Sequence, residues 1–174
     1  YVKRGKTDAA DAEAICEAVA RPTMHFVPIK TPDQQAALMM HRARELLVGQ
    51  RTALVNALRG HLAELGIVTA KGIHRVADLL AELVGVENTK IPPLARASLR
   101  CLAAQIEAVE SQVDELEALI IEWHKGNEAS QRLAKIPGVG PITASAVVAT
   151  IGNASNFTSA RHLSAAWGLT PRQN

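Results

Sequence analysis

Two aspartates near the start of the sequence are spaced as metal-ligating carboxylates can be. Asp8 and Asp11 lie three residues apart with alanines around them, so on a helix both carboxylates would project from one face. Mg²⁺ prefers such oxygen ligands, and paired carboxylates serve in two-metal phosphodiester chemistry. The alternative is an acidic first helical turn, which the helix dipole favours without any metal. Two carboxylates are too few for a complete site, so the other ligands would have to come from outside this sequence.

A glycine-containing turn is the second candidate, and it is suited to binding phosphate. Residues 133–144 contain an apolar helix end, a Pro-Gly-Val-Gly turn with Gly138 and Gly140, and a new helix rich in small residues. This is the helix-hairpin-helix pattern, in which glycines allow a close backbone approach and N–H groups at the helix start bind phosphate. Lys135 and Thr143 could add phosphate contacts. A plain turn in a packed helical bundle is the alternative.

The formal net charge of +2 hides an uneven distribution of charge along the sequence. Residues 99–128 hold seven acidic residues and two basic ones, whereas residues 131–174 hold four basic residues and no acidic one. Residues 31–61 have two acidic residues against four arginines: Arg42, Arg44, Arg51 and Arg59. Two basic zones around an acidic helix suggest two polyanion-facing surfaces with a spacer between them, and Arg172 could contact a phosphate or a base. A chance distribution of solvated charges is the alternative.

Capping residues, prolines and glycines mark the helices that would carry these groups. Thr7 can cap a helix at the start of residues 7–20. Thr31-Pro32 opens a long helix over residues 32–65, with proline at its first position. A shorter helix is expected over residues 73–85. A proline pair then opens a second long helix, over about residues 93–125, which Gly126 ends.

The second long helix carries a regular apolar pattern. Its apolar residues follow alternating steps of three and four, the a/d pattern of a coiled coil: Leu99, Leu102, Ile106, Val109, Val113, Leu116, Ile120 and Trp123. This seam must be buried against another helix. The partner is either the helix over residues 32–65, in an antiparallel hairpin, or a second copy of the chain, and the spacing does not separate the two.

Composition predicts an all-α fold, with long coiled-coil-like helices joined to a C-terminal helix-hairpin-helix domain. The 174 residues are 48% hydrophobic but only 3% aromatic, so small aliphatic residues form the core, as in closely packed helices. Cys16 and Cys101 have no metal-ligand spacing and are expected to be buried thiols in a reducing, cytoplasmic compartment. No apolar run approaches the roughly 18 residues of a membrane span, so no membrane contact is expected.

Taken together, these blocks resemble one family: bacterial insertion-sequence transposases with a DEDD RuvC-like domain and a C-terminal serine transposase domain. The Lys-Thr-Asp-Ala-Ala-Asp-Ala block that contains Asp8 and Asp11 looks like the end of the RuvC-like domain. The block 51–60 looks like the helix that follows it. The resemblance, with a domain boundary at Gly126 where the second long helix ends, divides the sequence into three parts: the end of a RuvC-like domain (1–30), a helical coiled-coil connector (31–126) and a helix-hairpin-helix transposase domain (127–174).

The resemblance implies DNA transposition guided by a structured bridging RNA, with four acids that bind Mg²⁺ and a serine nucleophile. Asp8 and Asp11 match the last two acids and are the expected catalytic and metal-binding residues. The other two acids would precede Tyr1 and the serine would follow Asn174, so the sequence is expected to be an internal piece, inactive by itself. The arginine-rich helix would bind nucleic acid, the guide RNA in particular, the glycine turn would follow a DNA backbone, and the coiled coil would support a homo-oligomer.

Two other classes of protein fit parts of the pattern. A non-catalytic helix-hairpin-helix module of a DNA-repair protein would also bind duplex DNA through residues 133–144. A coiled-coil assembly protein would use the apolar seam and bind no nucleic acid. DNA binding that weakens steeply with salt would fit the transposase or the repair module, whereas the assembly protein would show none.

Overall fold

The computed structural model describes residues 7–24, 26, 28–68 and 91–168. Within these ranges the regular structure is α-helical, with one short 3₁₀ helix and no β-strand, so the prediction of an all-α fold is confirmed. The chain divides into two compact units, Tyr1–Lys30 and Thr31–Asn174. The helix expected over residues 73–85 lies outside the described residues.

The first unit contains one described helix, α1 (Asp8–Ala20), with the predicted start. The Thr7 side chain accepts a hydrogen bond from the N–H of Ala10 over 3.3 Å, which satisfies one of the N–H groups that a helix start leaves without a partner. Asp8 and Asp11 lie in the first turn, where negative charge is favoured by the helix dipole. No residue of α1 is buried within the described part of the chain.

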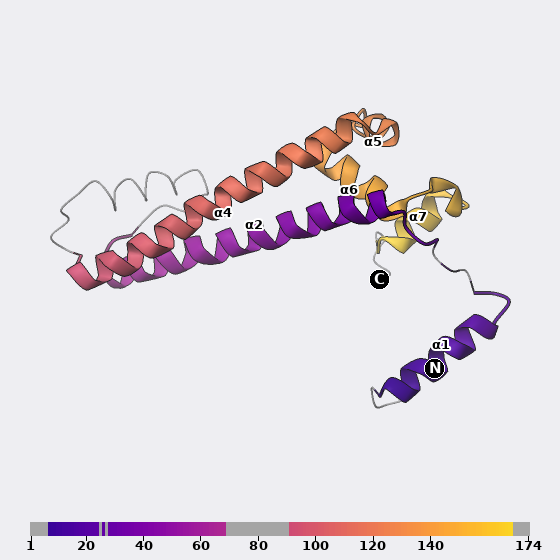
Figure 1. The fold of residues 1–174 in the computed structure, drawn as a ribbon, viewed down its shortest axis with the longest axis horizontal. Coiled ribbons are helices and arrows are strands. Elements are labelled where there is room, and N and C mark those ends of the chain that lie inside the picture. Colours follow the sequence, from indigo (N-terminus) through magenta and orange to yellow (C-terminus); the bar gives the residue numbers. More distant parts are fainter. Residues whose placement is uncertain (1–6, 25, 27, 69–90, 169–174) are drawn as a thin grey trace, which may run out of the picture. The chain divides into compact units, whose positions relative to one another are not determined.

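The second unit is organised around a long antiparallel hairpin of α2 (Pro32–Glu64) and α4 (Pro93–Lys125) (Figure 1). Thr31 and Gln34 form a capping box at the start of α2, in which each side chain accepts a hydrogen bond from the other residue's N–H. Beyond the end of α2, Gly66 has a φ of 75°, a conformation that glycine adopts without strain. The predicted boundaries of both long helices are therefore correct to within a residue or two.

The apolar seam of α4 is buried within the chain, against α2. All eight seam residues are buried or half-buried, with Ile106 and Ile120 at 0% exposure. Leu58 and Leu62 of α2 are equally enclosed, at 0% and 1% exposure. Each fully buried aliphatic side chain contributes about 1.5–3 kcal/mol. Of the two partners left open by the sequence, the structure shows the intramolecular one.

The remaining helices are short and follow the hairpin. They are α5 (Glu128–Leu133), α6 (Pro141–Ile151), the 3₁₀ helix η2 (Ala154–Asn156) and α7 (Ala160–Ala166). Helix α6 packs against α2, α4 and α5. It does so through small residues, since Ala144, Ser145 and Ala149 are all at 0% exposure. The hairpin thus forms a platform that positions the start of α6.

The prediction for the two cysteines was wrong, because Cys16 and Cys101 are both exposed. Cys101 lies between Leu99 and Leu102, and a helix turns by about 100° per residue, so its side chain points away from the buried seam. Cys16 belongs to α1, where no residue is buried in the described part of the chain. Among the described residues, no helix combines the length and the apolar character that crossing a membrane requires.

Candidate nucleic-acid interface

The glycine turn connects α5 to α6, and only one of its two glycine positions has a backbone conformation that requires glycine. Gly138 has a φ of 86°, which side chains of L-residues rarely tolerate, whereas Gly140 has an ordinary φ of −83° and serves as the N-cap of α6. The N–H of Val139 donates to the carbonyl of Ile136 over 3.0 Å, which closes the turn. A Cβ added at either glycine would meet no atom within 4 Å. The backbone of this turn is therefore open to a close approach from outside.

The start of α6 has N–H groups available for a ligand. No side chain caps this helix, and its first residue is proline, which has no N–H to donate. The N–H groups of Ile142 and Thr143 thus lie at the positive end of the helix dipole without a side-chain acceptor. The side chain of Thr143 is exposed, as is that of Lys135 at the other end of the turn. Arg132, in α5, forms an i,i+4 ion pair with Glu128 over 3.4 Å.

The four arginines of α2 do not form one exposed basic face. Arg42 is exposed, while Arg44, Arg51 and Arg59 are half-buried. The Nε of Arg44 donates to Glu117 of α4 over 2.7 Å, and Arg51 pairs with Glu110 over 3.3 Å. The two arginines are seven residues apart and so are the two glutamates, and in a coiled-coil pair of helices the same contacts recur every seven residues. The equal spacing of these acids was the sequence signal for the ion pairs, which sequence reasoning missed.

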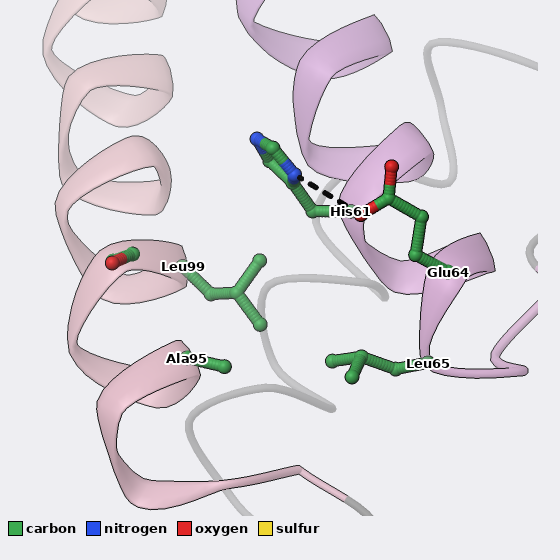
Figure 2. A pocket seen from close by; sticks show the side chains of 6 residues that line it. His61, Glu64, Leu65, Ala95 and Leu99 are labelled. Atoms are coloured by element: carbon green, nitrogen blue, oxygen red, sulfur yellow. Dashed lines mark ion pairs between the residues drawn. The ribbon is translucent and has the colours of Figure 1, made fainter.

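Arg42 lines a shallow depression on the outer side of α2. The other residues around it are Glu45, Leu46, Gly49, Gln50 and Ala53. A separate pocket of about 330 Å³ lies between the end of α2 and the start of α4 (Figure 2). At that pocket Nδ1 of His61 lies 4.0 Å from Oε2 of Glu64. The side chains of Leu65, Ala95 and Leu99 form its apolar walls. Among the described residues, none of those predicted to bind nucleic acid lines this pocket between α2 and α4.

The two predicted metal ligands belong to the first unit. Asp8 and Asp11 are exposed in the first turn of α1, three residues apart as expected for side chains on one helix face. Among the described residues, no three histidine, cysteine or acidic side chains gather as a metal site. Mg²⁺ commonly uses one or two carboxylates together with water and phosphate oxygens, so this pair has the chemistry of a partial ligand set. Arg172 lies outside the described residues.

Two buried serines pair with histidines, and sequence reasoning missed both pairs. Ser145 of α6 lies 3.1 Å from Nε2 of His41 in α2, and its hydroxyl also donates to the carbonyl of Pro141 over 2.8 Å. The Ser145 hydroxyl has one hydrogen, so a proton on Nε2 of His41 would allow both hydrogen bonds to form at once. Ser130 of α5 lies 2.7 Å from Nδ1 of His124 in α4. Both serines are at 0% exposure, so these pairs tie helices together and are inaccessible to a substrate.

Lowering the pH is expected to destabilise the Thr31–Asn174 unit through His41. Burial, and secondly the charge of Arg44, hold the pKa of His41 below its ordinary value of 6.5. The unfolded chain therefore binds the proton at a higher pH than the folded chain. The contribution to stability is complete above pH 6.5 and is lost as the pH falls from there through the folded-state pKa.

Urea unfolding at neutral and at mildly acidic pH measures this effect. A His41→Gln variant should lose stability at neutral pH but show a weaker dependence on pH than the unmodified chain. A His61→Gln variant is the control, because that side chain is exposed at the far end of α2. Identical pH dependence in the His41→Gln variant and the unmodified chain would contradict the assignment.

Two models of transposase families match the chain. One, described as the transposase IS116/IS110/IS902 family, matches residues 130–174 and therefore includes the glycine turn and α6. The other, described as a transposase and named for the DEDD domain of IS110, matches residues 1–67 and includes Asp8 and Asp11. No solved structure matches.

Several curated bacterial proteins resemble the chain over its whole length. A putative transposase of Sinorhizobium fredii is 46% identical over 174 residues, which are 100% of this chain and 44% of the relative. A probable family 20 transposase of Pseudomonas aeruginosa is 43% identical, over 100% of this chain and 52% of the relative. The transposase for insertion sequence element IS1111A of Coxiella burnetii is 40% identical, over 100% and 48%. The chain thus spans about half the length of the curated relatives it matches.

Proposed function

Because the chain belongs to the IS110/IS116 family of insertion-sequence transposases, we propose that it supplies DNA binding for transposition through the turn before α6. The observation that carries this proposal is the open Gly138–Gly140 turn followed by a helix without a side-chain cap. Residues 131–174 contain no acidic residue, so nothing in that segment repels a polyanion. Family membership argues against a DNA-repair module and against an assembly protein without nucleic-acid binding.

The turn binds phosphate in this proposal by three kinds of contact. The N–H groups of Ile142 and Thr143 donate to phosphate oxygens at the positive end of α6. Lys135 supplies a positive charge, and the Thr143 hydroxyl can donate as well. These contacts position the protein on the DNA backbone without reading the base sequence. The packing of α6 on α2 and α4 holds the donors in place before DNA arrives.

We extend the proposal to the metal and to the other partners of the whole protein. Asp8 and Asp11 present carboxylate oxygens from the first turn of α1 as part of a Mg²⁺ site. A bound Mg²⁺ would stabilise negative charge on a phosphodiester. A structured guide RNA as a ligand of the arginines on α2, a homo-oligomer formed through the long helices, and a cytoplasmic location belong to the same proposal. The last is in keeping with two exposed free thiols, which persist in a reducing compartment.

Replacing Gly140 with valine is the sharpest test of DNA binding at the turn. Its φ is ordinary and a Cβ added there meets no atom within 4 Å, so the fold should tolerate the change while the DNA backbone is pushed away. We expect the affinity for duplex DNA to fall by about tenfold or more, which corresponds to roughly 1.4 kcal/mol. Fluorescence anisotropy over a range of salt concentrations measures the affinity and the number of phosphate contacts.

Gly60→Val is the matched control for this experiment. Gly60 lies in α2, and a Cβ there also meets no atom within 4 Å, so this variant should retain full affinity. Gly138→Val is less informative, because its positive φ makes any side chain strained and its effect would mix folding with binding. Unaltered DNA affinity in a folded Gly140→Val variant, or binding that does not respond to salt, would overturn the proposed role of the turn.

A further inference from the structure

The two ion pairs between α2 and α4 are arranged with the acid toward the solvent. The Arg51 side chain is 16% exposed, whereas the Glu110 side chain that pairs with it is 48% exposed. The Arg44 side chain is 29% exposed and that of Glu117 is 35% exposed. In both pairs the guanidinium is the more enclosed partner. A ligand that approaches from the solvent therefore meets a carboxylate before it reaches the arginine.

These carboxylates occupy the arginine donors that a phosphate would use. Guanidinium groups bind carboxylates and phosphates with the same geometry, through parallel N–H donors. Arg44 already donates to Glu117 through Nε over 2.7 Å, with a second contact from its terminal nitrogen. Of the four arginines on α2, only Arg42 is exposed. Helix α4 thus neutralises two of the four arginine charges expected from the sequence of α2.

We propose that Glu110 and Glu117 form an autoinhibitory contact, which shields Arg51 and Arg44 from the phosphates of a nucleic acid. The inference rests on the proposed nucleic-acid binding and adds that these two contacts lower the affinity for nucleic acid. While these ion pairs are closed, they withhold two phosphate contacts on α2 from a nucleic acid. An ion pair this close to the surface is weak, so removing the charge of the carboxylate is enough to open it and to make the arginine available.

The double variant Glu110→Gln/Glu117→Gln tests this shielding. Glutamine keeps the size and the acceptor oxygen of glutamate but removes its charge, so the hairpin should remain folded, which a thermal melt verifies. We expect binding to become roughly threefold to tenfold tighter. The plot of log affinity against log salt should become steeper by about two, since two more phosphates are contacted.

The double variant Glu107→Gln/Asp114→Gln is the matched control. These two acids are exposed on α4, each three residues before a shielding glutamate, and their replacement changes the net charge by the same amount. They form no ion pair with α2 among the described residues, so removing them should leave the salt slope unchanged. Adding Arg44→Gln/Arg51→Gln to the first variant should abolish its gain, because the uncovered arginines are then missing.

A mixed-sequence duplex DNA and a stem-loop RNA serve as the two probes. A gain confined to one of them identifies the nucleic acid that reaches α2. Equal gains from the shielding pair and the control pair, or no gain from either, would overturn the shielding and leave the ion pairs as determinants of helix register. Failure of the unmodified chain to bind either probe would instead overturn the proposed function itself, so the two outcomes are distinguishable.

Discussion

Replacing Leu58 with alanine is expected to lower the free energy of unfolding of the Thr31–Asn174 unit by about 2–5 kcal/mol. Leu58 is at 0% exposure and belongs to the cluster of buried residues that also contains Leu62 and Ile106. Truncation there removes apolar contacts and leaves a cavity between two rigid helices that cannot collapse freely. The loss is a large fraction of the roughly 5–15 kcal/mol by which native domains are stable.

Urea denaturation followed by circular dichroism measures this loss. Leu46→Ala is the control, because Leu46 lies on the same helix but is 63% exposed. The control should change stability by no more than about 0.5 kcal/mol, as surface substitutions usually do. If the two variants unfolded at the same urea concentration, the α2–α4 hairpin could not be the core of the unit.

Replacing Ala144 with leucine is expected to disturb the docking of α6 and, with it, DNA binding. Ala144 is at 0% exposure in a helix that packs against α2, α4 and α5. A leucine there overfills the interface, which costs about 1–3 kcal/mol. Because the glycine turn immediately precedes α6, a shift of this helix misplaces the N–H donors. We therefore expect both a lower unfolding midpoint and weaker, less salt-dependent binding.

Ala53→Leu is the corresponding control, since Ala53 is exposed on α2 and leucine is a good helix former. It should leave the unfolding midpoint and the DNA affinity nearly unchanged. A variant at Ala144 that loses stability but binds DNA normally would show that α6 does not position the turn. The Gly140→Val variant complements it, because that change leaves the packing of α6 untouched.

Local signals were enough to predict most of the helix boundaries. Threonine caps, prolines at helix starts and glycines at helix ends act within a few residues, so the sequence carries them directly. The burial of the a/d seam was also predictable, since heptad spacing follows from helix geometry alone. The exposure of Cys101 could have been deduced from the same spacing, because its position falls outside the seam.

The partners of these elements depend on contacts between distant parts of the sequence. A heptad seam has the same appearance whether it packs on its own chain or on a second copy, so only the fold separates the hairpin from the dimer. A basic stripe likewise does not reveal whether acids cover it, as Glu110 and Glu117 do. His41 and Ser145 are 104 residues apart, and nothing in either local sequence marks them as a pair.

The length of the hairpin sets a distance that can be expressed in base pairs. Helix α4 has 33 residues, and a rise of 1.5 Å per residue gives a rod of about 50 Å. One strand of duplex DNA rises 3.4 Å per nucleotide, so the rod is about as long as 15 base pairs. The two ends of α4, at Pro93 and Lys125, are thus separated by roughly one and a half turns of DNA. Groups held at the two ends of this unit would meet a straight duplex on nearly opposite faces.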